Sequence, residues 1–235
     1  MRQQPARLIW FAILTVSAVA ILISLGAWQL RRSAWKQELI AAIALRAHAA
    51  PQPLPPIRDW PALLPADYEY RRVVAEGIFD HAKEALILRA GKEPGYHVLT
   101  PLALKSGGYV IVNRGFVPLD HAQQSSRSGG LIQGETAVRG LMRKPEARNF
   151  FTPAGNPAAG QFFTSDPDLI ARHFGLVPAA PFTIDSEATP LPGGWPRGGT
   201  TVLNLPNNHY PYALTWFGLA LAAIAVFAVF AWQNR

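Results

Sequence analysis

The stretch LIWFAILTVSAVAILISLGAWQL, residues 8–30, contains no charged residue and decides how the rest of the chain is organised. An α-helix rises 1.5 Å per residue, so about 20 apolar residues cross the roughly 30 Å hydrocarbon core of a bilayer. Trp10 and Trp28 stand near its two ends, where indole rings favour the headgroup layer. The stretch therefore predicts a transmembrane helix. It continues well past a small-residue tripeptide at positions 18–20 and is too long for a cleaved signal peptide, so we expect an uncleaved anchor.

A second stretch, YALTWFGLALAAIAVFAVFAW, residues 212–232, is also long enough to cross a bilayer and also has aromatic residues at both ends. Two spans place both termini on one side of a membrane and the central region on the other. Basic residues flank both ends of the first span, so charge does not decide the orientation. The predicted organisation is a tail (1–7), a first transmembrane helix (8–30), a helix with a proline-rich connector (31–65), an extramembrane β-rich domain (66–206), an interfacial segment with a second transmembrane helix (207–232), and a tail (233–235).

Charge is confined to the centre of the chain, where every acidic residue lies between Glu38 and Glu187. The formal net charge is +7, but there is no dense run of Lys and Arg, so we expect membrane lipids rather than nucleic acid as the partner of this basic surface. The absence of cysteine excludes disulfides, thiolate metal sites and covalent c-type haem attachment.

The central region is dominated by short segments rich in β-branched and aromatic residues, separated by Gly, Pro and Asp clusters. We expect one mainly-β, α+β domain, built as a small antiparallel sheet or open barrel and flanked by two transmembrane α-helices. The single helix expected within it runs over residues 166–175, with an Asp N-cap and a Gly C-cap. The predicted strands are residues 70–79, 84–90, 96–104, 109–117, 135–142 and 181–186.

No motif of a known enzyme class is present: HExxH, GxSxG, P-loop and GxGxxG patterns are all missing. The six histidines are scattered, with no pair at i, i+3 or i+4, so no mononuclear metal cage is predicted. We therefore expect a protein that is not an enzyme.

Two arginine-bearing stretches invite a functional interpretation. LGAWQLRRSAWK, residues 25–36, is either an aromatic and basic membrane anchor or a collar in which Arg31 and Arg32 hold acidic groups. VNRGFVP, residues 112–118, is either a strand with a glycine bulge or a sheet rim from which Arg114 binds a carboxylate or a partner.

The stretch NNHYPYALTWFGLA, residues 207–220, is a helix start, with two asparagines suited to N-capping and a proline tolerated in the first turn. Capping does not explain His209, which we expect one or two residues outside the helix at the edge of the low-dielectric layer. A neutral imidazole there either makes an interfacial hydrogen bond or offers a ring nitrogen to a metal.

Five blocks in order, GAWQLRRSAWK, EYRRVVAEGIFDHAKE, GYHVLTPL, VIVNRGFVP and GGTTVLNLPNNHYPYALTWFGLA, resemble the Surfeit locus protein 1 family. These membrane proteins assist cytochrome c oxidase biogenesis. The resemblance implies an assembly factor that helps haem a reach the catalytic subunit, with His209 as the proposed haem ligand. It also implies a central domain on the periplasmic or intermembrane-space side. We expect a bacterial inner membrane, with the mitochondrial inner membrane as the alternative.

Within that interpretation, His209 would coordinate the iron, Arg31 and Arg32 would meet the haem propionates, and Trp28 and Trp216 would stack on the ring. The partners implied are the oxidase catalytic subunit and, as a possible donor, haem a synthase. The alternative is a cofactor-free scaffold or chaperone that stabilises the immature oxidase subunit. A copper chaperone is a weaker option because soft Cu(I) ligands are lacking.

Overall fold

The computed structural model describes residues 4–91, 93–148, 150, 152–153, 161–201 and 206–233. The predicted terminal tails, 1–7 and 233–235, lie partly outside these residues. The chain forms two compact units, residues 1–44 with 203–235, and residues 45–202. Each unit is described by itself.

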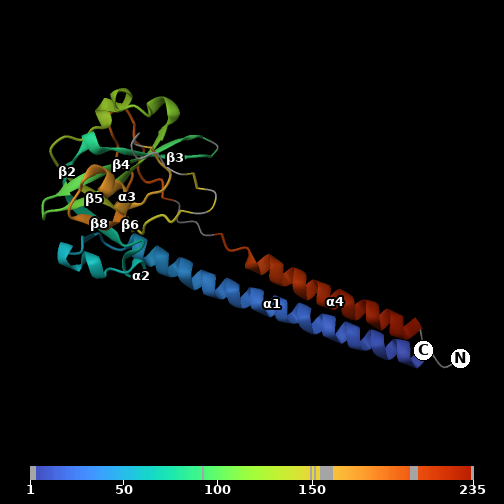
Figure 1. Cartoon of the computed structure of the whole chain (residues 1–235). Helices are drawn as coiled ribbons and strands as arrows, with labels where there is room; N and C mark the ends of the chain where they lie inside the picture. Colours follow the sequence, from blue (N-terminus) through green and yellow to red (C-terminus); the bar gives the residue numbers. More distant parts are fainter. Residues whose placement is uncertain are drawn as a thin grey trace. The chain divides into compact units, whose positions relative to one another are not determined.

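The first unit is a pair of antiparallel helices, α1 (Gln4–His48) and α4 (His209–Gln233), which lie side by side (Figure 1). The predicted first span and the predicted helix after it are one continuous helix, because no proline or glycine pair interrupts residues 31–48. Both α1 and α4 are long and apolar enough to cross a membrane.

Small residues let the two helices approach closely. Gly26 faces the ring of Phe217, and a Cβ at that position would lie 2.6 Å from Phe217 Cε1. Ala213 and Ala220 are buried on the same face of α4, and the rings of Phe11 and Phe230 stack at 4.6 Å near the other end. Large apolar side chains elsewhere on both helices are exposed. A bilayer would cover these outward faces.

The second unit is a β-barrel with short helices. Its helical segments are η1 (Ile57–Ala62), α2 (Pro65–Tyr68), η2 (His81–Lys83), η3 (Leu119–His121), η4 (Gln124–Gly130) and α3 (Pro167–Phe174). Its strands are β1 (Gln52–Pro53), β2 (Arg72–Phe79), β3 (Ala85–Arg89), β4 (Gly95–Leu104), β5 (Tyr109–Pro118), β6 (Glu135–Arg143), β7 (Gln161–Phe162) and β8 (Ala179–Ser186).

The strand order β2-β6-β8-β5-β4 returns to β2, so five strands close a barrel. The expectation of an open barrel or a purely antiparallel sheet was wrong on both counts, since β5 and β8 pair in parallel. Closure occurs at the end of β2, where residues 77–79 pair with 104–102 of β4 while 72–78 pair with β6. Gly77 permits it, because a Cβ there would lie 2.2 Å from the carbonyl oxygen of Ala103.

Strand β5 is buried on both faces. Val110 and Val112 belong to the core inside the barrel, whereas Ile111 packs in a second cluster with Leu99 of β4 and Ile170 of α3. A strand covered on both sides needs a continuous apolar run, which explains why VIV does not alternate with polar residues. α3 begins at its predicted N-cap, since Asp166 Oδ1 accepts hydrogen bonds from the backbone N–H groups of residues 168 and 169.

The proline-rich connector closes one side of the barrel core. Trp60 of η1 is buried, its Nε1 donates to the carbonyl oxygen of Pro55 at 3.0 Å, and its ring meets Phe182 edge-on at 6.0 Å. The connector therefore packs against the barrel core as well as linking α1 to the barrel.

Gly77→Ala should destabilise the barrel by roughly 1–3 kcal/mol, because the new methyl group meets a backbone carbonyl that cannot move without breaking the β2–β4 closure. Denaturant unfolding of the full chain in detergent, followed by near-ultraviolet circular dichroism, measures this. Gly91→Ala is the matched control, since a Cβ at Gly91 meets nothing within 4 Å. Equal unfolding midpoints for the two variants would contradict the closure argument.

Candidate functional site

His209 is the first residue of α4, so the expectation that it stands outside the helix was wrong. Its Nδ1 lies 2.7 Å from Oε1 of Gln29 on α1. A carbonyl-type oxygen only accepts hydrogen bonds, so in the neutral ring Nδ1 carries the hydrogen and Nε2 keeps its lone pair. A histidine that binds a metal commonly donates its other N–H to such an acceptor, which fixes both tautomer and ring orientation.

The segment before α4 is tied to the same face of α1. Asn207 Nδ2 donates to the carbonyl oxygen of Ser33 at 3.0 Å, and Lys36 Nζ donates to that of Pro206 at 2.5 Å. Gln29, Ser33 and Lys36 are spaced i, i+4 and i+7, so they form one polar stripe along about 10 Å of helix. Sequence reasoning missed this stripe, although its helical spacing is visible within LGAWQLRRSAWK.

The predicted arginines do not share that stripe. At about 100° per residue, Arg31 projects roughly 200° around α1 from Gln29, on the side away from His209 and contrary to expectation. Arg32 projects from the flank, where its Cζ lies 4.0 Å above the ring of Trp35. Trp28 lies one turn before Arg32 on the same flank and is 51% exposed. No ion pair of either arginine occurs among the described residues.

Trp216 is half-buried on α4, two turns after His209 and on the same side of that helix. It therefore lines the helix pair on the side from which His209 projects. No ring contact of Trp216 occurs within the described part of the chain.

Arg114 is 4% exposed, so its predicted place at an open rim was wrong. Its Nη2 donates to the carbonyl oxygen of Gly130, and its Cζ lies 5.0 Å above the ring of Phe79. Burial lowers the pKa of its guanidinium to about 10, which leaves the group charged at neutral pH. Arg114 ties η4 to the barrel, beside a buried pair formed by Arg127 and Glu84.

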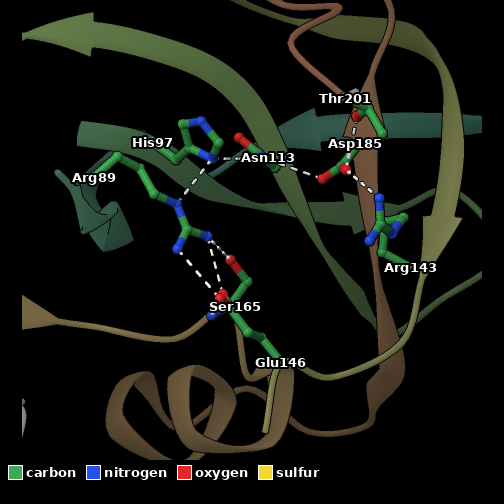
Figure 2. Close-up of polar contacts among 8 residues, drawn as sticks. All are labelled: Arg89, His97, Asn113, Arg143, Glu146, Ser165, Asp185 and Thr201. Atoms are coloured by element: carbon green, nitrogen blue, oxygen red, sulfur yellow. Dashed lines mark hydrogen bonds and ion pairs between the residues drawn. The ribbon is translucent and has the colours of Figure 1, made fainter. Parts of the chain in front are cut away.

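A second candidate site is a pocket of about 440 Å³ on the outer face of the barrel. It begins where the apolar cluster under α3 ends, because Asn113 follows Ile111 at i+2 on β5. Figure 2 shows its hydrogen-bonded and ion-paired side chains, which come from β3, β4, β5, β6 and β8 and from three connecting segments. They are Arg89, His97, Asn113, Arg143, Glu146, Ser165, Asp185 and Thr201.

Two carboxylates anchor this network. Both oxygens of Glu146 accept from Arg89, at 3.3 and 2.9 Å, and one also accepts from the backbone N–H of Ser165. Asp185 accepts from Asn113 Nδ2 at 2.9 Å and from the Thr201 hydroxyl at 2.8 Å. No short motif links these residues, which explains why sequence reasoning missed the pocket. The one available signal was Asn113, a polar residue that directly follows the apolar run of residues 110–112 in β5.

His97 is held neutral at the centre of the network. Burial lowers the pKa of its ring, and the neighbouring Arg89 lowers it further. Its Nδ1 faces two donors, Arg89 Nε and Asn113 Nδ2, each at 3.4 Å. Asn113 is oriented in turn because its Oδ1 accepts from the backbone N–H of Gly115 at 3.0 Å. Nδ1 is therefore the acceptor, and the ring hydrogen sits on Nε2.

Comparison with known proteins identifies the family of this chain. The profile of the SURF1 family matches residues 16–221. Surfeit locus protein 1 of Mus musculus is 36% identical over 230 residues, covering 91% of this chain and 72% of the mouse protein. The protein of the same name from Takifugu rubripes is 35% identical over 232 residues, covering 91% of this chain and 92% of the fish protein. The chain belongs to the SURF1 family.

The SURF1 match contains both candidate sites. It includes Gln29 and His209 of the helix pair, and every residue drawn in Figure 2. The expected resemblance is thereby confirmed over most of the chain.

The stability of this SURF1 protein should fall as the pH drops from 7 towards 5, and His97→Gln should reduce that dependence. The folded state holds the pKa of His97 below the ordinary value of about 6.5, so the unfolded chain binds the proton first. Each such proton contributes a slope of up to about 1.4 kcal/mol per pH unit. His81, whose pKa burial also lowers, should contribute in the same direction.

The measurement is denaturant unfolding of the wild type and of His97→Gln across this pH range. His121→Gln serves as the control for removal of an imidazole. An unchanged slope in His97→Gln would show that the network does not hold the ring neutral.

Proposed function

We propose that this protein is an assembly factor for cytochrome c oxidase that binds haem a at the membrane interface and assists its insertion into the catalytic subunit. Membership of the SURF1 family supports the assembly role through the resemblance described above. The single observation that supports haem binding is the Gln29–His209 contact, because it leaves Nε2 of His209 with a free lone pair.

The helix pair supports a membrane setting. α1 and α4 present exposed apolar side chains over most of their length, and lipid would remove that surface from water. We propose a multi-pass protein of the bacterial inner membrane with its β-barrel domain in the periplasm. The corresponding mitochondrial arrangement places the domain in the intermembrane space.

The donor set fits a haem cargo. His209 would provide one neutral nitrogen ligand, and the exposed Trp28 and half-buried Trp216 provide aromatic surface on the two helices. Arg32, whose Cζ lies 4.0 Å above the ring of Trp35, would meet a propionate. A single nitrogen ligand without a covalent link suits a carrier, because transfer requires release.

His209→Ala should lower the haem content of protein purified from cells that make haem a, measured as the Soret absorbance per protein. Gln29→Leu should also lower the haem content, because Nδ1 of His209 loses the acceptor that fixes the tautomer. We expect the affinity for haem to fall about tenfold. His121→Ala is the control, since that imidazole pairs with Asp120 in the other unit. A wild type that is colourless yet retains the oxidase catalytic subunit would instead establish the cofactor-free scaffold.

Arg32→Gln should weaken haem retention more than Arg31→Gln does. The two side chains carry the same charge at adjacent positions, but only Arg32 projects on the flank next to the α4-facing stripe. Haem content after gel filtration compares the two variants at equal folding, judged by far-ultraviolet circular dichroism. Equal losses would show that bulk positive charge, rather than position on the helix, holds the propionates.

A further inference from the structure

The barrel pocket of Figure 2 has the dimensions of a small-molecule site. Its volume of about 440 Å³ falls within the range of ligand pockets, roughly 300–1,000 Å³. Charged and hydroxyl side chains dominate its wall, together with Pro145 and Ala147. Every described residue that lines it belongs to the β-barrel unit.

The two carboxylates of the pocket are engaged within the network. Glu146 receives three hydrogen bonds, two from Arg89 and one from the backbone of Ser165, and Asp185 receives one on each oxygen. Glu146 therefore has little capacity left to recognise a donor on a ligand, whereas each oxygen of Asp185 keeps a lone pair. The two carboxylates hold Arg89 and Asn113 in place.

His97 and Arg143 both keep nitrogen donors for a ligand. The Nε2–H of His97 has no hydrogen-bond partner among the described residues, because both of the ring's contacts use Nδ1. The guanidinium of Arg143 likewise makes no hydrogen bond in the described part of the chain. Its Nη1 lies 3.5 Å from Asp185 Oδ2 as an ion pair only, and its side chain is 29% exposed.

Arg143 lies over an aromatic ring. Its Cζ lies 4.7 Å above the ring of Tyr70, and the backbone of Tyr70 is in the left-handed region, with φ 66°. No other non-glycine residue in the described ranges has a positive φ. Such strain costs on the order of 1–3 kcal/mol and persists where the surroundings impose it. A guanidinium is a planar fork that matches the two oxygens of a carboxylate.

We propose that this pocket binds a small carboxylic acid in its singly charged form, with Arg143 pairing to the carboxylate. The three cations of the wall are each paired with a carboxylate: Arg89 with Glu146, Arg143 with Asp185, and Lys144 with Glu69 outside the wall at 3.0 Å. A singly charged ligand therefore adds little unbalanced charge, whereas a doubly charged phosphate would be repelled more strongly by Asp185 and Glu146. The site is independent of the haem function proposed above.

Isothermal titration calorimetry on the full chain in nonionic detergent tests the proposal, at neutral pH and constant ionic strength. The probes are acetate, lactate and inorganic phosphate. We expect saturable binding of acetate or lactate with a dissociation constant around the millimolar range, and weaker binding of phosphate. Arg143→Gln should weaken carboxylate binding about tenfold or more, and Arg143→Lys should also weaken it because the fork is lost.

Arg139→Gln is the matched control, because Arg139 lies on the same face of β6 four residues earlier but outside the pocket wall. His209→Ala should bind the probes like the wild type, which separates this site from the haem site. Absence of saturable carboxylate binding in the wild type overturns the proposal. Phosphate binding as tight as that of the carboxylates, or undiminished binding in a folded Arg143→Gln, also overturns it. If Arg143→Gln fails to fold, Arg143→Lys provides the same comparison.

Discussion

The β-barrel unit depends on the return of β2 to β4, which closes five strands into one ring. Gly77 makes this possible, since the backbone of Ala103 occupies the space that any side chain would need. Closure satisfies the backbone hydrogen bonds of the strands that would otherwise be edges. Closure buries the inner face of β5 and the cluster under α3 buries part of its outer face, so polar side chains on that strand must find partners. Asn113 joins the network around His97, and Arg114 pairs with the backbone of η4.

In the helix pair, the contact between the helices is set by small residues, and its register is set by a few polar contacts at one end. Gly26 and Phe217 determine how near the helices come. Gln29, Ser33 and Lys36 then hold the start of α4, because hydrogen bonds in an apolar setting are strong and directional. The same contacts that begin α4 therefore orient His209.

Each candidate site contains a histidine, and the two imidazole rings are hydrogen-bonded in opposite ways. At His209, Nδ1 meets an acceptor, Gln29 Oε1, so Nε2 offers a lone pair and suits a metal. At His97, Nδ1 meets two donors, Arg89 and Asn113, so Nε2 carries the hydrogen and suits an anion. Burial alone does not produce this difference. The chemical character of each site follows from whether the neighbour of Nδ1 gives or takes a hydrogen bond.

The sequence alone determined both long apolar helices, most strands of the domain, the capped helix at Asp166 and membership of the SURF1 family, because each depends on local periodicity, capping or collinear motifs. It also singled out His209 as a residue that capping does not explain. Only the tertiary structure decided barrel closure, the burial of Arg114, the side of α1 from which Arg31 projects, and the network around His97. The physical reason is separation along the chain. Gln29 and His209 lie 180 positions apart, and Asn113 and Asp185 lie 72 apart, so no local pattern specifies which atom faces which.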